Sequence, residues 1–281
     1  AIGAILLLQM LVLSPAATPW NRLRGDDLYV TASYQRVIGD GVGRDFAYAH
    51  LPPHYPPLFF AVIGTLAGWL GWTGVGAAKL GAAVATALVP LVVGLWWSRR
   101  RATAAELASP AFPLLLTLLA FVAVDYPSVL TKPYEFISAV VALLWWVAAH
   151  RSFAVPQRVA WWRIALLGLV GAALLTTYYL WLVLAAIAGC LAAAQLGWRY
   201  LARWAEVAGV ALLASAWYWW PLLASYQRLG MENWLPAFFI SSDLNFFPPL
   251  EFNLRSACLW LGLVSLIVYR RRLAVRPAVY F

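Results

Sequence analysis

Long apolar runs separated by short polar segments dominate the chain. The runs occupy residues 1–14, 57–72, 80–98, 111–124, 136–149, 164–178, 180–197, 206–223 and 257–269. A helix needs about 20 apolar residues to cross the hydrocarbon core of a bilayer, and several of these runs approach that length. The pattern therefore predicts an all-α fold, a polytopic bundle of transmembrane helices.

The composition supports a membrane protein rather than a large soluble domain. Of the 281 residues, 64% are hydrophobic and 11% are charged, and the mean hydropathy is +0.76. A soluble domain carries about 25% charged residues. We expect residues 1–281 to form one membrane domain whose first span, 1–14, is truncated, and we expect the parent protein to continue beyond residue 281. A cleaved signal peptide is disfavoured for 1–14, because no basic segment precedes the apolar run.

The arginines predict which side of the bilayer each loop occupies. Cytoplasmic loops are enriched in Arg and Lys, and the basic clusters lie at 99–101, 151–163, 199–203 and 270–276. All four fall on one side only if the run 57–72 does not cross the bilayer. This run is short and is interrupted by three glycines. We therefore expect a juxtamembrane helix at 57–72 that lies at the interface or is re-entrant, within a large external loop over 15–79.

This topology accounts for the net charge of +9. It assigns 12 basic and 2 acidic residues to the cytoplasmic side, and 8 basic and 9 acidic residues to the outside. The positive charge therefore reflects the positive-inside bias and attraction to anionic lipid head groups, and nucleic acid is not an expected partner. The two cysteines show no zinc or redox spacing and predict no disulfide framework.

The stretch LPPHYPPLFF at 51–60 contains four prolines. Each proline fixes φ and lacks a backbone donor, and unpaired donors are costly at an apolar interface. We expect a rigid elbow where the external loop turns onto the membrane. The elbow is either purely structural or shapes a site, in which case His54 and Tyr55 are candidates. The prolines exclude a helical His50–His54 pair, so no metal site is predicted.

External acidic residues near a membrane are candidates for function. Asp26 and Asp27 are adjacent, and their mutual repulsion favours retaining a proton on one of them, as suits a general base. The alternative is that they cap an amphipathic helix at 28–38. Asp125 lies at the outer end of a span, near Lys132, which either holds a lipid phosphate or extends towards head groups.

The remaining external segments give weaker signals. The Gly-rich stretch around Asp40, Arg44 and Asp45 lacks the lysine and the strand–helix context of a phosphate loop, so turns are predicted there. Most tyrosines and tryptophans fit an aromatic belt, while a minority can stack on sugar rings. The last external loop, 224–256, predicts a second segment lying on the membrane surface.

In this order, the features resemble the GT-C glycosyltransferases: a first span, a large external loop with an acidic pair, a proline elbow and a juxtamembrane helix. FAYAHLPPHYPPLFFAVIGTLAGWLGWTGVGAAKLG (46–81) is more specifically similar to the actinobacterial galactan arabinofuranosyltransferases of the AftA type, in which a YADLPPFYP element leads into a similar helix and then a lysine. YYLWLVLAAIAG (178–189) and FFPPLEFNLRSACLWLGLV (246–264) also resemble later spans of that family. The likeness covers its N-terminal membrane domain, without the remaining spans and the external C-terminal domain.

The resemblance implies transfer of an arabinofuranosyl residue from decaprenyl-phosphoryl-arabinofuranose to cell-wall galactan, with inversion and with phosphate leaving. An acid in the first external loop is the general base of such enzymes, which implies Asp27 as base and Asp26 as its orienting neighbour, or the reverse. Outer-face residues expected to bind the donor or balance its phosphate are His54, Tyr55, Asp125, Lys132, Arg44, Arg228 and Arg255. No cofactor or metal is predicted. The implied location is the plasma (inner) membrane, with the active site on the external, periplasmic face.

Two other functions are open. One is a GT-C enzyme that uses another polyprenyl-phosphate sugar, such as a mannose donor. The other is a non-enzymatic transporter or assembly scaffold, which predicts acidic residues inside the spans along a transport path. Almost no acids lie within the runs, and no internal repeat is evident, which favours an enzyme with its site on one face.

Overall fold

A computed structural model describes residues 26–46, 50–98, 132–155, 158–229 and 254–269. These residues form helices and turns without any strand, so the predicted all-α class is confirmed for this part of the chain. The runs 1–14 and 111–124, Asp125 and most of the loop 224–256 lie outside the described residues.

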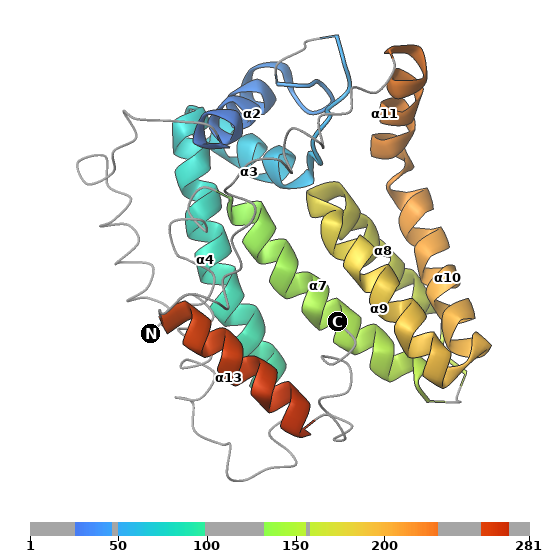
Figure 1. Ribbon diagram of the computed structural model, residues 1–281. Coiled ribbons are helices and arrows are strands. Elements are labelled where there is room, and N and C mark those ends of the chain that lie inside the picture. Colours follow the sequence, from blue (N-terminus) through green and yellow to red (C-terminus); the bar gives the residue numbers. More distant parts are fainter. Residues whose placement is uncertain (1–25, 47–49, 99–131, 156–157, 230–253, 270–281) are drawn as a thin grey trace.

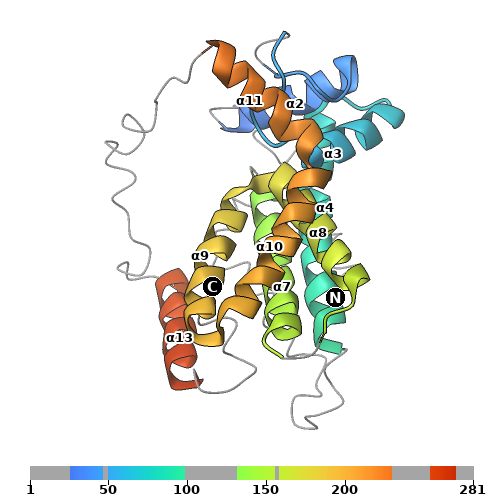
Figure 2. The same cartoon turned by 90° about the vertical axis from the view of Figure 1, so that its right-hand side faces the viewer.

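The helices follow most of the predicted runs. In chain order they are α2 (Asp26–Asp40), α3 (Leu58–Trp69), α4 (Gly74–Ser98), α7 (Pro133–Phe153), α8 (Trp161–Tyr178), α9 (Leu180–Leu196), α10 (Trp198–Ala214), α11 (Ala216–Leu229) and α13 (Leu254–Tyr269). Helices α4 and α7–α10 run side by side as a bundle (Figure 1). Helices α2, α3 and α11 gather at one end of this bundle in both views (Figure 2).

Length and composition give two to four candidate membrane spans among the described residues. Helices α7 and α8 are each long and apolar enough to cross a membrane alone. The pair α3 and α4 and the pair α10 and α11 qualify only as bent units, with bends of 118° and 75°. These helices indicate a multi-pass membrane protein.

Helix α3 lies across the end of the bundle instead of continuing the line of α4 (Figure 1). The chain reverses at Gly71, whose φ of +70° is easy for glycine and strained for other residues. Glycine also allows close packing at position 64, where an added Cβ would lie 2.8 Å from Val37 Cγ1 of α2. This geometry fits a helix at the membrane interface, as expected for the run 57–72.

The apolar run 206–223 is divided between two helices that meet at a bend. Helix α10 ends at Ala214, and α11 begins at Ala216 at an angle of 75°. Side-chain donors take up carbonyls at the break: Ser215 Oγ donates to the Ala211 carbonyl at 2.7 Å, and Trp219 Nε1 donates to the Leu212 carbonyl at 2.9 Å. The Ala211 carbonyl also keeps the backbone N–H of Ser215 at 3.0 Å, and the Leu212 carbonyl accepts from the side chains of Trp219 and Ser215. Neither carbonyl is therefore left unpaired where the helix bends.

Two buried clusters hold the helices together. In the first, Trp146 of α7 stacks on Trp204 of α10 with ring centroids 4.9 Å apart, and small residues of α9 pack beside them. In the second, Tyr34 of α2, Phe60 of α3 and Tyr134 of α7 meet beneath α2. Close packing of this kind is the main attraction between helices in lipid, where burial of apolar surface supplies little.

The two ends of the bundle differ in chemistry. One end is formed by the C-terminus of α7 and the N-termini of α8 and α10 (Figure 1), and it carries Arg151, Arg158, Arg163, Arg199 and Arg203. We call it the arginine-rich end. The opposite end carries α2, α3, the elbow and α11, and we call it the aromatic end. The fold thus gathers two of the predicted basic clusters, 151–163 and 199–203, at the end opposite the elbow.

Candidate functional site

The elbow is fastened to the preceding loop by Asp45. The backbone N–H of His54 donates to Asp45 Oδ2 at 3.1 Å, and the backbone N–H of Asp45 donates to the Leu51 carbonyl at 3.0 Å. Arg36 Nε of α2 donates to the Asp45 carbonyl at 3.2 Å and also pairs with Asp40. These bonds tie residues 45 and 51–54 to each other and to α2.

Asp45 is only 6% exposed, which sequence reasoning missed. The predicted turns are present: Gly41 and Gly43 have φ of +78° and +120°. No local signal separated Asp45 from its neighbour Asp40, because the elbow that buries Asp45 follows several residues later in the chain. A buried carboxylate beside a hydrogen-bonded backbone is a stronger candidate for a defined role than an exposed one.

A row of four tyrosines extends from α2 to the C-terminal end of α8. Ring centroids are 5.3 Å apart for Tyr29 and Tyr55, 5.6 Å for Tyr55 and Tyr134, and 6.2 Å for Tyr134 and Tyr178. Tyr55 and Tyr134 also share a side-chain hydrogen bond. Four phenols in one row give the aromatic end flat apolar faces with polar edges.

Burial keeps Tyr29 and Tyr55, the first two phenols of this row, protonated. Desolvation raises the pKa of Tyr29 above its ordinary value, and the nearby Asp45 carboxylate raises that pKa further. Desolvation likewise raises the pKa of Tyr55. Both hydroxyls therefore remain neutral hydrogen-bond donors at physiological pH.

Helix α11 contacts the elbow through two tyrosines, Tyr218 and Tyr226. Tyr226 Oη lies 2.6 Å from His54 Nδ1, with the rings in an edge-to-face arrangement. Tyr218 Oη donates to the His54 carbonyl at 3.2 Å. The sequence placed Tyr218 only in the aromatic belt and did not single out Tyr226. Their contacts depend on the break at Ser215, which directs α11 over the elbow.

Lys132 lies at the start of α7, at the same end as the elbow. Its Nζ is 3.8 Å from Glu135 Oε1, with both side chains partly exposed. Tyr178 forms a side-chain hydrogen bond with Glu135. The predicted cation thus belongs to a polar group where the start of α7 lies beside the end of α8, close to the tyrosine row.

The structure brings some of the sequence-predicted residues together and leaves others apart or undescribed. His54 and Tyr55 lie in the elbow, and Arg44 lines a narrow hollow with Tyr29, Asp45 and Tyr55. Arg228 lies in the last turn of α11. Asp26 and Asp27 form the first two residues of α2, which begins slightly earlier than the predicted helix 28–38. The side chains of Asp26, Asp27 and Arg255, and Asp125 as a whole, lie outside the described part of the chain.

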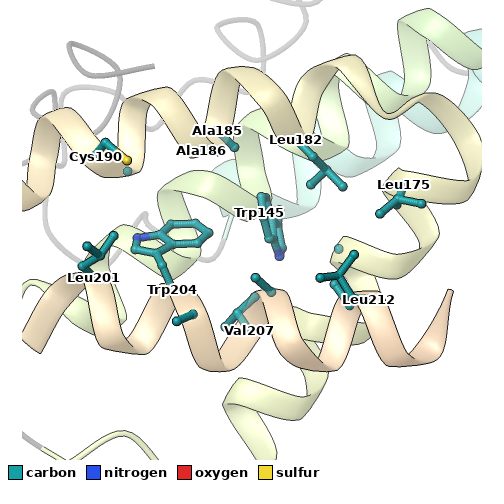
Figure 3. A pocket seen from close by; sticks show the side chains of 15 residues that line it. Trp145, Leu175, Leu182, Ala185, Ala186, Cys190, Leu201, Trp204, Val207 and Leu212 are labelled. Carbon is teal, nitrogen blue, oxygen red and sulfur yellow. The ribbon is translucent and has the colours of Figure 1, made fainter. Parts of the chain in front are cut away.

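An apolar groove runs along the bundle below the aromatic end. It has a volume of about 370 Å³ and lies between α9 and α10, with α7 and α8 behind it. Trp145 and Trp204 project into it, and Leu175, Leu182 and Leu212 surround its end nearest the tyrosine row (Figure 3). An elongated apolar groove among membrane helices suits a hydrocarbon chain.

Metal ligands do not cluster in the described residues: no group of three or more His, Cys, Asp or Glu side chains there is placed to hold an ion. Comparison with known proteins adds no relative. No protein-family model matches the chain, and no curated protein is significantly similar to it.

Proposed function

We propose that the protein is a membrane glycosyltransferase of the GT-C type that transfers an arabinofuranosyl residue from decaprenyl-phosphoryl-arabinofuranose to cell-wall galactan with inversion. One observation carries the proposal: four features lie together at one end of the bundle. They are the proline elbow, the tyrosine row, Lys132 and the start of α2, which bears Asp26 and Asp27. Below them lies an apolar groove. A lipid-linked sugar needs this combination of a polar, sugar-binding end and an apolar channel.

The reaction is a single displacement at the anomeric carbon. A galactan hydroxyl oxygen attacks that carbon, the bond between the carbon and the phosphate oxygen breaks, and decaprenyl phosphate leaves. A positioned carboxylate that accepts the hydroxyl proton contributes about 10²–10⁴-fold in rate. Asp27 is our proposed base and Asp26 its orienting neighbour, or the reverse.

Charge on the leaving phosphate has to be balanced at the aromatic end. Lys132 is the best-placed cation, because it lies beside the tyrosine row at the start of α7. In the free protein its ammonium group faces Glu135, and binding of the donor phosphate competes with that weak, partly exposed pair. Arg44, Arg228 and Arg255 are further cations proposed for the same role.

In this proposal, the other residues of the aromatic end and the groove bind and orient the donor. Tyr55 and Tyr29 supply aromatic faces for the sugar ring, and their neutral hydroxyls donate hydrogen bonds. Asp45 holds the elbow through the His54 N–H and is a positioning residue. The groove beside Trp145 and Trp204 accommodates the prenyl tail. The aromatic end is external and the arginine-rich end cytoplasmic, with the chain in the plasma membrane.

The test is transfer of radiolabelled sugar from decaprenyl-phosphoryl-arabinose to a short galactofuranose acceptor by the protein in membranes. Wild type is compared with Asp26→Asn and Asp27→Asn, at matched protein level and donor binding. We expect one variant to lose transfer by at least about 100-fold. Transfer from a mannose donor only would replace the donor assignment. Absence of transfer from either donor would favour a transporter or scaffold, and full activity in both variants would remove the acidic pair from the mechanism.

A further inference from the structure

A second cavity lies at the arginine-rich end, away from the proposed transfer site. It has a volume of about 520 Å³ and lies between the end of α7 with Ala154, Val155 and Val159 on one side and the start of α10 on the other. Its lining is mixed: Phe153, Val159 and Leu196 are apolar, whereas Arg199, Arg203 and Glu206 are charged. This mixture differs from the wholly apolar groove between α9 and α10.

The charge in this cavity is positive. Arg203 Nη1 contacts both carboxylate oxygens of Glu206, at 3.0 Å and 2.9 Å, so these two charges offset each other. Arg199 has no ion-pair partner within the described part of the chain. Further positive charge at the same end of the bundle comes from Arg151, Arg158 and Arg163.

One wall of the cavity is held in place by a buried polar contact. Tyr200 is almost fully buried, and its hydroxyl lies 2.9 Å from Nδ1 of His150 in α7. The ring of Phe153 packs against Tyr200, with centroids 6.4 Å apart. The start of α10 is thereby fastened to the end of α7, so the space between them exists before any ligand arrives.

Exposed tryptophans place the cavity at the depth of lipid head groups. Trp161 at the start of α8 is 79% exposed, and Trp198 at the start of α10 is 75% exposed. Indole rings concentrate at the boundary between hydrocarbon and head groups. Trp198 immediately precedes Arg199, so the arginine lies at the same level as that boundary.

We propose that this cavity binds the phosphate head group of an anionic phospholipid from the cytoplasmic leaflet. The guanidinium of Arg199 is available for paired hydrogen bonds to phosphate oxygens, and Arg203 provides a second cation at the rim. The apolar side chains of Phe153, Val159 and Leu196 contact the first carbons of the acyl chains. A soluble phosphate would leave this apolar half of the lining unused, which favours the lipid as the source of the phosphate.

The experiment is native mass spectrometry of the detergent-solubilised protein with an equal mixture of phosphatidylglycerol and phosphatidylcholine. We expect wild type to retain phosphatidylglycerol preferentially and Arg199→Ala to lower its retention by about tenfold, the loss of one charged hydrogen-bond pair. Because Arg199 makes no described ion pair, this change leaves the Arg203–Glu206 pair and the His150–Tyr200 contact in place. Circular dichroism and size-exclusion profiles verify the fold.

Arg163→Ala is the matched control, since it removes the same charge from the same end but lies outside the lining. We expect it to keep retention within about twofold of wild type. Equal losses in both variants, or no preference for phosphatidylglycerol in wild type, would overturn the site. Binding of glycerol phosphate as tight as that of the lipid would overturn the choice of a lipid ligand. Transfer activity is not the readout, so failure here is distinct from failure of the proposed function.

Discussion

The hydroxyl of Tyr226 lies 2.6 Å from Nδ1 of His54, although 172 residues separate the two in the chain. The contact joins α11, beyond the break at Ser215, to the proline elbow before α3. With the bond from Tyr218 to the His54 carbonyl, it makes His54 the point where the segment between α2 and α3 meets α11. The position of α11 is therefore coupled to the conformation of the elbow.

Replacement of Tyr226 tests this coupling. Tyr226→Phe keeps the ring and removes one partly exposed hydrogen bond, so we expect a loss of at most about 1.5 kcal/mol in stability. Under the proposed function, transfer activity should fall severalfold, because α11 then holds the elbow through one hydrogen bond fewer. The measurement is the sugar-transfer rate together with the thermal midpoint. Tyr179→Phe, at an exposed tyrosine in the turn between α8 and α9, is the control and should behave like wild type.

The role of Asp45 is separable from its charge. Asp45→Asn retains an oxygen that can accept the His54 N–H, so we expect near-normal stability and transfer. Asp45→Ala leaves that donor without its acceptor and should destabilise the protein by about 1–3 kcal/mol. Unfolding in denaturant and the transfer assay measure both effects. If Asp45→Asn abolishes transfer in a stable protein, Asp45 is the base and the positioning role is wrong.

Packing of α8 against α10 depends on Gly168. A Cβ added there would lie 2.4 Å from Val210 Cβ, so Gly168→Ala forces the helices apart. We expect a loss of about 1–3 kcal/mol from this overpacking, seen as a lower midpoint in thermal unfolding. Gly209→Ala in α10 is the matched control, because its added Cβ meets nothing within 4 Å. If Gly209→Ala lowers the stability as much as Gly168→Ala does, the loss comes from the backbone effect of replacing glycine and not from the contact with Val210.

High pH should weaken the aromatic end. The pKa values of Tyr29 and Tyr55 are raised in the folded state, so the folded protein binds these protons more tightly than the unfolded chain. Their contribution to stability is complete below the unfolded pKa of about 10 and is lost as pH rises beyond it. We expect thermal midpoints to show no decline from these groups between about pH 7 and pH 9, and a decline above about pH 10.

Tyr29→Phe with Tyr55→Phe supplies the control for the pH effect. Phenylalanine has no proton to lose, so the decline above pH 10 should become shallower in the double variant. A decline identical to that of wild type would assign the effect to other groups. Absorbance of the ionised phenol follows the titration of the remaining tyrosines directly.

Local signals in the sequence were sufficient for most of the helices and for the elbow. The runs 136–149 and 164–178 correspond to α7 and α8, because long apolar stretches without charges satisfy their backbone groups only as helices in a membrane. The prolines of 52–57 excluded a helix there, and the turns at Gly41 and Gly43 followed from the glycines. Each of these features depends on residues within a few positions of one another.

Only the tertiary structure decided the site. The burial of Asp45, the contacts of His54 with Tyr218 and Tyr226, and the cavity around Arg199 each join segments that are distant in the chain. The break at Ser215 was hidden within a continuous apolar run, because hydropathy does not record which carbonyls side chains will take. By itself, the sequence determined where helices form, since apolar length and proline act locally. Which side chains meet at the aromatic end was decided by helix packing, which depends on shape across the whole bundle.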